Sequence, residues 1–529
     1  MRKKERACWT VLFFALLFLA TPNLCPESWA EDMEILTSNI AIGTTVRHEW
    51  FPFVEYNSMD NDFMVVWHTG GKLIEEDTIS HDGIDGQIVS PKGEPVGDPF
   101  VLSPPEPGWK TLPKLAHNMY TNEYMVTFTT GLTFIGQSGY VGRLNSSGEY
   151  LYGPNLLYDS PYNISHPTIV FNSGRQEYLA AYNDKYVVSE TETLDNLGFI
   201  LDVNGDVING PFLIGSSEGT QFNPQVVYNS VDDTYMVNWE DFRNVGGMWD
   251  SSDIYGALLN HEGEQIDEIA MIDDFGEEDE GDQRVQKIAF NPDRKEFLAV
   301  WRDKRPALDD AGLVGRMFQS DGTPAGEDFV ILDPTGDQGY PQFIYVQKKK
   351  QYFIVWDDTR NGNSDIYAGW LNESGKQVGD DIPICTDPGN QGYPYIAYSP
   401  LMERFLITWR DTHAPNDYDV LPDEGGGHIP GSPGDIKGAL YGKPSFLCGQ
   451  VSDQETENPV EGALVIAIGP GFPVFKQTNM GGWFNIEKHF QLRGMYMVMV
   501  FKSGYNMAIK ILNYAGDPLE ASIEMTSWW

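Results

Sequence analysis

Short apolar runs separated by Gly, Asn and Asp turns fill most of this chain, which is the pattern expected of β-strands. One stretch, Gln221 to Asp273, reads as four such strands joined by turns. Within it Tyr235 and Trp239 lie four residues apart, so on an extended strand both rings point to the same face. Close variants of this stretch occur seven times, and the other aromatic pairs are Phe63/Trp67, Tyr124/Phe128, Tyr178/Tyr182, Phe297/Trp301, Tyr352/Trp356 and Phe405/Trp409.

The repeat has the length and the strand number of a β-propeller blade. Successive first members of the aromatic pairs are roughly 53 to 62 residues apart, and four-stranded repeats of about that length are typical of propellers. Each repeat also carries a glycine inside its third strand, which indicates a close approach of another chain segment. These glycines are Gly86, Gly142, Gly198, Gly256, Gly315, Gly369 and Gly438.

The two ends of the repeat array suggest how it closes. The seventh repeat leaves for a different kind of sequence after Leu440, so it lacks a last strand of its own. Residues Glu34 to Ser38 precede the first repeat in the way that Ile331 to Thr335 precedes the sixth. Pairing this N-terminal strand into the seventh blade would remove two exposed sheet edges. We therefore predict an all-β fold, in which a seven-bladed β-propeller spanning residues 31–445 is closed by an N-terminal strand.

The sequence changes character from Phe446 to the end. The segments Cys448 to Asp453, Asn458 to Val465 and Thr478 to Ile486, followed by Gly504-Tyr505, resemble the carboxypeptidase regulatory-like domain. The resemblance covers residues 446–529 and implies a small transthyretin-like β-sandwich, an accessory module without catalytic residues. The propeller repeats resemble those of secreted bacterial proteins with a Y-L-V-V-W-x-D-x-R…D-I-Y-G motif, here Tyr235 to Gly256 and Tyr352 to Gly369. That second resemblance implies a fold but no particular activity.

The N-terminus and the charge indicate an exported protein. Residues 1–30 have a basic start, an apolar run from Val11 to Ala20 and a small-x-small site at Ser28 to Ala30, as in a cleaved signal peptide. No later segment has the roughly 20 apolar residues of a transmembrane helix. The net charge of −42 disfavours nucleic acid as a partner. We expect a secreted or periplasmic protein, in which Cys385 and Cys448 form either a disulfide or two buried thiols.

A repeated Trp-x-Asp-x-Arg motif is expected to be structural. In an up-and-down blade, the loop between strands two and three lies on the same face as the link to the next blade, and the long insertions collect on this face. An arginine can bridge two carboxylates there, so we predict Asp-Arg-Asp clamps at the roots of these loops. The residues concerned are Asp241, Arg243, Asp253, Asp303, Arg305, Asp358, Arg360 and Asp365, with Trp409, Asp411, His413 and Asp435 as a weaker copy.

Aromatic residues near the start of the innermost strands are candidate ligand-binding residues. Innermost strands line the axis of a propeller, and aromatic faces stack on sugars and hold cations. The alternative is packing between adjacent blades. The candidates are Trp50, Trp109, Phe222, Tyr340 and Tyr393.

Calcium is a possible cofactor, and no other is indicated. The acidic run Asp273 to Asp282 and the segment Asn361 to Asp365 could offer the oxygen ligands that calcium needs. Neither matches a complete EF-hand loop, and a solvated acidic loop is the alternative.

No catalytic signature stands out along the chain. It lacks a G-x-S-x-G elbow, an H-E-x-x-H helix and a P-loop. The best non-repeated polar group, His413, Asp417, Asp419 and His428, lies in the longest insertion. We therefore expect a non-catalytic binding protein that recognises a glycan or protein ligand on its loop-rich face. Two alternatives stay open: a carbohydrate-active hydrolase or lyase using Asp or Glu in the propeller pocket, and a structural cell-surface or matrix protein with a plugged axis. The sequence leaves the oligomeric state open.

Overall fold

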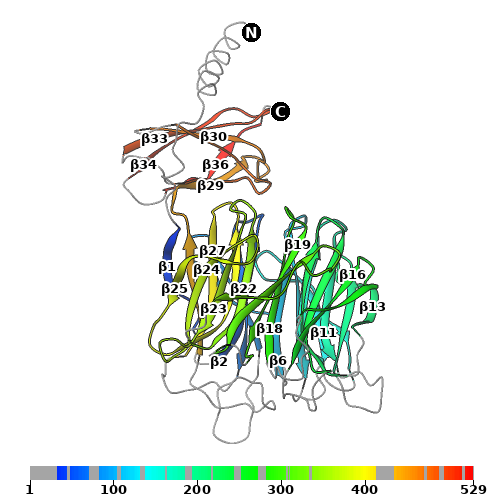
Figure 1. Ribbon diagram of the computed structural model, residues 1–529. Helices are drawn as coiled ribbons and strands as arrows, with labels where there is room; N and C mark the ends of the chain where they lie inside the picture. Colours follow the sequence, from blue (N-terminus) through cyan, green and yellow to red (C-terminus); the bar gives the residue numbers. More distant parts are fainter. Residues whose placement is uncertain are drawn as a thin grey trace, which may run out of the picture.

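The structure is a computed structural model, and its described residues form an all-β protein of repeated four-stranded sheets (Figure 1). It describes residues 33–44, 48–70, 83–103, 109–131, 138–160, 164–184, 194–215, 219–243, 252–271, 282–305, 308, 310–332, 336–412, 434–469, 473–487, 494–514 and 519–527. The predicted signal peptide, residues 1–30, lies outside these ranges. Within them, no helix is long and apolar enough to cross a membrane.

Nine four-stranded sheets are present in the described part of the chain, and six of them each use four consecutive strands. These six are β2(His48–Asn57) to β5(Pro95–Val101) through β3(Asp62–Gly70) and β4(Gly83–Val89); β6(Trp109–Asn118), β7(Glu123–Gly131), β8(Ser138–Asn145) and β9(Tyr150–Tyr158); β10(Ile164–Asn172), β11(Glu177–Asp184), β12(Asp195–Leu201) and β13(Val207–Ile214); β14(Gln221–Asn229), β15(Thr234–Asp241), β16(Asp253–Asn260) and β17(Gln265–Ala270); β18(Gln283–Asn291), β19(Glu296–Asp303), β20(Gly312–Gln319) and β21(Phe329–Leu332); and β22(Gln338–Val346), β23(Gln351–Asp358), β24(Asp365–Asn372) and β25(Gln377–Cys385).

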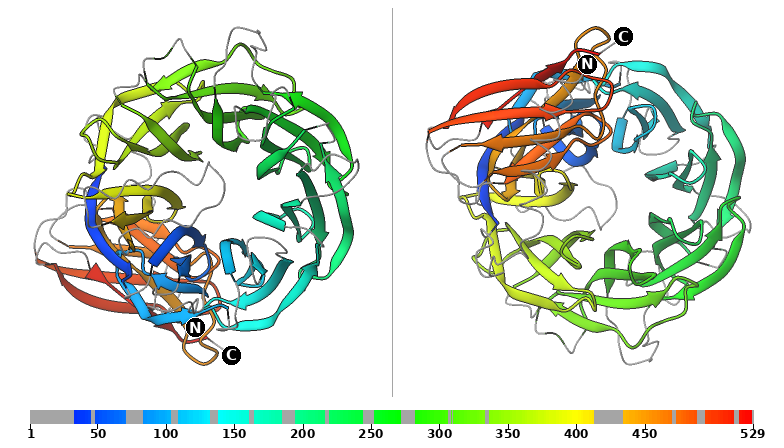
Figure 2. Two further views of the ribbon diagram at one scale, coloured as in Figure 1. Left: turned by 90° about the horizontal axis from the view of Figure 1, so that it is seen from below. Right: turned by 90° about the horizontal axis from the view of Figure 1, so that it is seen from above.

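A seventh sheet joins the start of the chain to the end of the repeats. It contains β26(Asn390–Ser399), β27(Arg404–Thr412) and β28(Gly434–Gly442), and β1(Glu34–Gly43) pairs antiparallel with β28. The first strand of each of the seven sheets contacts the first strand of the next, and β26 contacts β2. Figure 2 shows the resulting ring of sheets seen along its axis. We call β2, β6, β10, β14, β18, β22 and β26 the inner strands.

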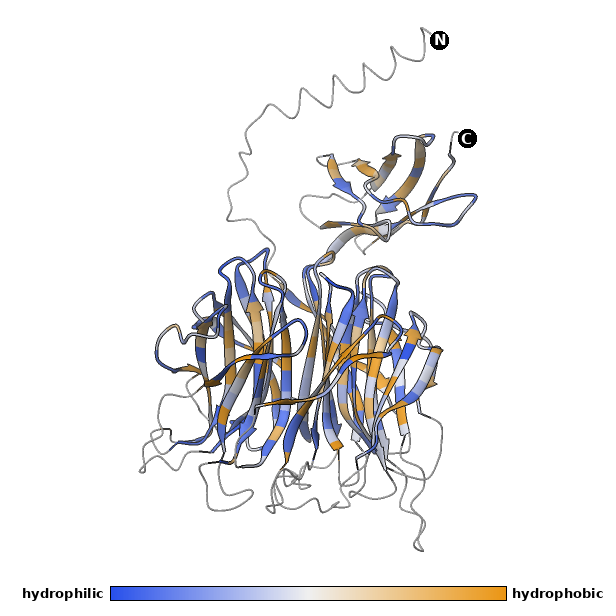
Figure 3. Cartoon of the chain, turned by 90° about the vertical axis from the view of Figure 1, so that its right-hand side faces the viewer, coloured by the Kyte–Doolittle hydropathy of each residue, from blue (hydrophilic) through white to orange (hydrophobic). Residues whose placement is uncertain are grey.

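The recurring aromatic residues explain why each repeat folds into the same sheet. The aromatic pairs of the second strands are buried in all seven sheets, as in Phe63 and Trp67. The first member of each pair lies directly opposite a Tyr, Phe or His of the inner strand, and in the sixth sheet the Tyr345 and Tyr352 ring centroids are 5.1 Å apart. Such cross-strand aromatic pairs stabilise a sheet beyond their burial alone. Figure 3 shows the hydrophobic residues concentrated along the strands and hydrophilic residues at the tight turns.

The glycines inside the third strands make room for side chains of the fourth strand. A Cβ on Gly198 would lie 2.3 Å from the ring of Phe212, and one on Gly142 would lie 2.4 Å from Tyr150. The predicted close approach is therefore present at these positions, and the covering group comes from the outermost strand.

An irregularity at the same place in every inner strand shapes the axis. Each inner strand bulges after its first few residues, so that the ladder with the second strand skips two residues. The first skipped residue has a positive φ although it is not glycine, and proline follows it in six of the seven strands. Proline is tolerated in a central ladder only where the hydrogen bonding is already interrupted. These bulge residues are Phe51, Leu112, His166, Asn223, Val285, Tyr340 and Tyr393.

The last 85 residues form two further sheets beside one end of the ring. One contains β29(Ser445–Asp453), β32(Trp483–Glu487), β35(Leu519–Glu520) and β36(Ile523–Met525), and the other β30(Leu464–Ile468), β31(Val474–Gln477), β33(Gly494–Phe501) and β34(Ala508–Tyr514). They enclose a core of their own that includes Phe484 and Tyr496.

These C-terminal sheets contact the ring at its tight turns (Figure 1). The Trp483 indole NH donates to the Met59 carbonyl at 2.9 Å, and the Asn485 amide donates to the Leu401 carbonyl at 3.3 Å. Both acceptors lie in turns that follow an inner strand. Of the two interpretations of the cysteines, buried thiols are the one observed, because Cys385 and Cys448 are both buried and no disulfide joins them.

Candidate functional site

A cavity of about 540 Å³ lies on the axis of the ring. The first residue to rejoin the ladder after each bulge lines it, so all seven inner strands contribute one equivalent position. This axial ring comprises Phe53, Lys114, Thr168, Gln225, Lys287, Gln342 and Tyr395. The cavity extends to Ser230 and Pro292, in the tight turns after β14 and β18. A purely structural protein was expected to have a plugged axis, and the cavity is contrary to that expectation.

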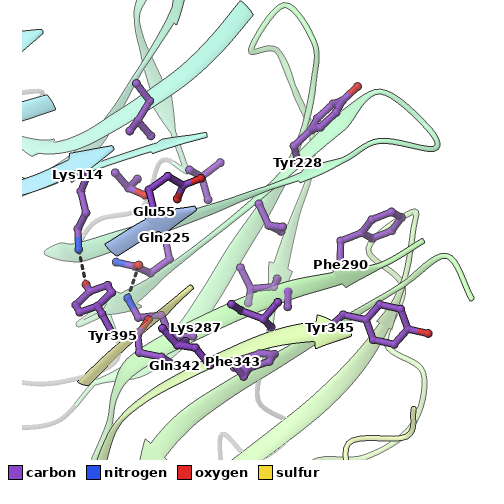
Figure 4. Close-up of a pocket in the computed structure, with 18 of the residues that line it drawn as sticks. Glu55, Lys114, Gln225, Tyr228, Lys287, Phe290, Gln342, Phe343, Tyr345 and Tyr395 are labelled. Atoms are coloured by element: carbon purple, nitrogen blue, oxygen red, sulfur yellow. Dashed lines mark hydrogen bonds between the residues drawn. The ribbon is translucent and has the colours of Figure 1, made fainter. Parts of the chain in front are cut away.

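Two lysines and a tyrosine meet in the axial ring. Figure 4 shows Lys114 directed at Tyr395, with Lys287 and Gln225 beside them. The Lys114 ammonium donates to the Tyr395 hydroxyl, and the Lys287 ammonium donates to the Gln225 side-chain oxygen. Lys114 also lies 4.2 Å from the Tyr395 ring centroid and 4.8 Å from that of Phe53. An ammonium group held between aromatic rings in this way is stabilised by cation–π attraction.

Burial makes both lysines weakly basic. Removal from water lowers the pKa of Lys114 to about 7, and it lowers the pKa of Lys287 to about 8, to which the neighbouring Lys114 charge also contributes. His166, on the bulge of β10, has its pKa lowered to about 3 by burial and by the charges of these two lysines. The three basic groups therefore lie close enough together for the lysine charges to lower the pKa of His166, and for the Lys114 charge to lower that of Lys287.

Glu55 is the one acidic residue among those that line the cavity. It lies two residues after Phe53, and the residues at its level in the other inner strands are apolar: Ala116, Val170, Val227, Ala289, Ile344 and Ala397. Burial raises the pKa of Glu55 to about 8, and a backbone hydrogen bond from His117 opposes this shift. The raised pKa favours the protonated form of this side chain at neutral pH, beside a cavity that also holds two lysines.

Two further carboxyl groups lie at the level of the bulges, on second strands. Glu240 Oε1 accepts from the Val285 backbone NH at 2.9 Å and from the Asn223 amide at 3.2 Å. Asp357 Oδ2 accepts from the Tyr393 backbone NH at 3.4 Å. Burial raises the pKa of each to about 7, although these hydrogen bonds lower it.

In a third sheet a side-chain amide, rather than a carboxylate, accepts the hydrogen bond from the bulge NH, which indicates that this hydrogen bond is structural. Asn183 Oδ1 accepts from the Asn223 NH at 2.7 Å. In all three cases the acceptor follows the second aromatic residue of its strand and bonds the bulge of the next sheet. These side chains therefore satisfy backbone groups that the bulge removes from the ladder.

The structure brings together two of the five predicted ligand-binding aromatics. The rings of Tyr340 and Tyr393 have centroids 4.4 Å apart, and Phe51, which the prediction did not include, lies 4.9 Å from Tyr393. All three are bulge residues of adjacent inner strands.

The other three predicted aromatics do not join this group. Trp50 packs against His68, with the Arg410 guanidinium 5.0 Å from its ring, and Phe222 packs against His166 at 4.2 Å. The side chain of Trp109 lies outside the described residues. Whether any of the five binds a ligand stays a prediction.

The Trp-x-Asp-x-Arg motifs form the same hydrogen-bonded unit three times. In the fourth sheet the Asp241 carboxylate accepts from the Trp239 indole at 2.8 Å and from Arg243 at 2.7 and 2.8 Å. The sets Trp301, Asp303, Arg305 and Trp356, Asp358, Arg360 repeat this arrangement.

The second carboxylate of each clamp differs from the prediction. It comes from the fourth strand or the residue before it: Glu268 for Arg243 at 2.7 Å, Asp328 for Arg305 at 2.7 Å and Asp381 for Arg360 at 2.6 Å. Asp365 instead accepts from the amides of Asn361 and Asn363, each at 2.7 Å, and Asp253 lies opposite Asp241 in the ladder. The guanidinium also packs on a third-strand ring, as Arg243 does on Tyr255 at 3.8 Å from the ring centroid.

The weaker copy in the seventh sheet lacks this arginine, and its Asp411 pairs with the Lys437 ammonium of β28. Its His413 lies outside the described residues, as do Asp417, Asp419 and His428.

The described residues contain no cluster of side chains suited to calcium. No group of three or more His, Cys, Asp or Glu side chains there could hold a metal ion. The carboxylate of Asp365 is already occupied by two amides of its own loop. Residues 273–281 of the acidic run lie outside the described residues, so calcium binding there stays a prediction.

Comparison with known proteins yields structural neighbours. No family model and no curated protein matches the chain. A protein of unknown function from Dyadobacter fermentans has a TM-score of 0.44 at 11% identity, covering 78% of this chain and 100% of its own. An α-L-arabinanase from Penicillium chrysogenum has a TM-score of 0.40 at 9% identity, covering 77% and 98%. An α-L-arabinofuranosidase from Fusarium graminearum has a TM-score of 0.38 at 9% identity, covering 76% and 97%.

This comparison corrects the main functional expectation. A non-catalytic binding protein was the leading interpretation of the sequence, but several of the structural neighbours are glycoside hydrolases and another is a deacetylase of N-acetylgalactosamine. The alternative, a carbohydrate-active enzyme, agrees better with them. Since the TM-scores lie below 0.5, the case for that alternative has to come from the residues of this chain.

Proposed function

We propose that this protein is a carbohydrate-active enzyme whose reaction centre is the axial cavity. The observation that carries the proposal is the protonated Glu55 carboxyl facing the same cavity as Lys114 and Lys287. A proton donor for glycosidic bond cleavage must hold its proton at the working pH, and burial gives Glu55 a pKa of about 8. The lysines, with pKa values of about 7 and 8, can exchange protons in the same pH range.

The cavity has the size and lining of a glycan subsite. A volume of about 540 Å³ lies in the range of ligand pockets. Its wall combines aromatic faces, Phe53 and Tyr395, with the amides of Gln225 and Gln342. Aromatic faces stack on sugar rings and amides bond sugar hydroxyls, so one wall can both hold and orient a sugar.

The surrounding architecture is proposed to be a seven-bladed propeller closed by β1, with an accessory sandwich at residues 446–529. Seven equivalent sheets and the β1–β28 pairing support the first part. The separate core of the C-terminal sheets, which contact the ring at its tight turns, supports the accessory sandwich. Export by an N-terminal signal peptide remains a proposal from the sequence alone.

The direct test is cleavage of a panel of purified polysaccharides by the full chain and by Glu55→Gln. Glutamine keeps the shape of Glu55 but cannot donate the proton. We expect new chain ends from at least one polysaccharide with the natural protein, and about 100-fold slower release with the variant. Equal rates for the two proteins, or no cleavage of any polysaccharide by a folded sample, would contradict the proposal.

A further inference from the structure

The charge inside the axial cavity is opposite to the charge of the whole protein. The chain carries a net charge of −42, yet two lysines of the axial ring come from opposite parts of the ring, on β6 and β18. Neither ammonium forms an ion pair with a carboxylate among the described residues; each instead donates to a neutral oxygen, of Tyr395 or Gln225. Buried cations without a counter-ion are costly to a folded protein and therefore mark functional positions.

Three observations make the lysines a converging pair. Both lie at the same level of the axis, since each is the first residue after the bulge of its strand. Both lie over the face of one ring, because the Lys114 and Lys287 ammonium groups are 4.2 and 5.6 Å from the Tyr395 centroid. Both also act on His166, whose pKa their charges depress. An anion at this point of the axis would face two cationic donors at once.

The carboxyl groups nearby do not compete for this role. The raised pKa of Glu55 favours its protonated form at neutral pH, and Glu240, whose charge also raises the pKa of Lys287, accepts hydrogen bonds from Val285 and Asn223. Asp357 is likewise bonded to the bulge of β26. The lysine pair is thus left for a ligand rather than for the protein.

The geometry points to an acidic sugar as the ligand of Lys114 and Lys287, with a uronic acid carboxylate lying between the two ammonium groups at the Tyr395 ring. This inference rests on the proposed function, because it names the substrate class of the same cavity. A carboxylate can accept from both lysines while its sugar ring stacks on Phe53 or Tyr395. A sulfate ester has the same charge and could use the same donors, so the two sources must be separated by experiment.

The access route agrees with a chain-like ligand. The cavity runs from the lysine level past Val227, Ala289 and Ile344 to the turns at Ser230 and Pro292. The C-terminal sheets contact the ring at Ser58, Met59 and Leu401, on the sheets of β2 and β26. Figure 2 shows them over one side of the ring, away from the sector that contains β14 and β18.

The test is calorimetric binding to the Glu55→Gln variant, in which proton donation is blocked so that binding is read without cleavage. The probes are an oligouronate, a sulfated galactan oligosaccharide and a neutral arabino-oligosaccharide. Lys114→Met and Lys287→Met are added singly in this background, since methionine fills a similar volume without charge. Lys295→Met is the matched control, because Lys295 is an exposed lysine in the turn of the same sheet as Lys287.

We expect the oligouronate to bind best and each axial substitution to weaken it by at least about 10-fold, with no change for Lys295→Met. Binding at pH 8 should also take up protons, measured from the heats in two buffers of different ionisation enthalpy, because the carboxylate favours the charged lysines. Stronger binding of the sulfated probe would assign the site to sulfate and overturn the uronate inference.

Preferred binding of the neutral probe, unaffected by either axial substitution, would overturn the substrate class and leave the proposed enzyme function standing. No binding by any probe, together with no cleavage of the polysaccharide panel, would contradict both.

Discussion

The Trp-x-Asp-x-Arg clamps and the axial ring both lie at equivalent positions of different sheets, but the clamps repeat the same residues and the axial ring does not. At the clamps, three sheets use the same Trp, Asp and Arg residues, and the bond from the Trp indole to the Asp carboxylate is 2.8 to 3.1 Å in each. In the axial ring, seven equivalent positions hold five residue types: Phe, Lys, Thr, Gln and Tyr. Repetition indicates a structural role that several sheets share, and departure from it indicates positions with a role at one place only.

The level of Glu55 shows the same contrast in a simpler form. Six inner strands place Ala, Val or Ile there, which is what packing at the centre of a ring requires. On the remaining inner strand, β2, the carboxyl of Glu55 adds nothing to packing, and it lowers the free energy of unfolding once it is ionised. A residue of this kind is a candidate for a chemical role.

The largest stability effect should follow from breaking a clamp. Asp358→Ala removes the acceptor of the Trp356 indole and of Arg360, and it leaves buried donors without a partner. We expect a loss of about 3 kcal/mol in the free energy of unfolding, measured by denaturant titration. Asp381→Ala removes only the outer arm of the same clamp, so its effect should be smaller. A larger loss for Asp381→Ala than for Asp358→Ala would show that the motif aspartate is not the centre of the clamp.

A smaller effect is expected at the turn glycines, which also belong to the repeated framework. Gly263 has a φ of +86°, and a Cβ there would lie 2.2 Å from the Phe212 ring of the neighbouring sheet. Gly263→Ala should therefore cost about 2 kcal/mol, from strain and overpacking together. Gly379 has a φ of +81° with open space around it, so Gly379→Ala isolates the strain at about 1 kcal/mol. Equal losses in the two variants would mean that contact between sheets contributes nothing.

The effect on stability at Glu55 should be absent at low pH and should grow as the pH rises. The pKa of Glu55 is raised from 4.5 to about 8 in the folded protein, so the folded state binds more protons than the unfolded state between these values. The contribution of Glu55 to stability is therefore complete below pH 4.5 and is lost as the pH rises to 8. Glu55→Gln should leave the melting temperature unchanged at pH 5 and raise it by a few degrees at pH 8. A variant that melts lower than the natural protein at pH 8 would contradict the raised pKa of Glu55.

The repeated framework could be predicted from the sequence, and the site could not. The aromatic pairs, the third-strand glycines and the N-terminal strand all leave periodic signals, and each has the expected structural counterpart, for instance β1 beside β28. Lys114 and Glu55 carry no such signal, because an isolated lysine or glutamate in a strand is normally a solvated residue. Counting residues from the inner-strand prolines would have aligned Lys114 with Tyr395, but it would have missed Lys287, because β18 has Gln286 where the other inner strands have proline. The burial that shifts their pKa values depends on six other strands, which no local pattern contains.

The predicted clamp partners were wrong for a related reason. Asp365 is closer in sequence to Arg360 than Asp381 is, but the pairing of β25 with β24 brings Asp381 within 2.6 Å of the guanidinium. The loop carboxylate is meanwhile held by the amides of Asn361 and Asn363. Side-chain competition of this kind is decided by geometry rather than by spacing.

The most direct test of the division between framework and site compares the natural protein, Glu55→Gln and Asp358→Ala. Melting temperature is measured for each, together with turnover of a polysaccharide that the natural protein cleaves. The account predicts that Glu55→Gln loses about 100-fold in turnover with no loss of melting temperature at pH 8. Asp358→Ala should lose melting temperature and keep its turnover at temperatures where it is folded. Full turnover in Glu55→Gln, or lost turnover in folded Asp358→Ala, would contradict it.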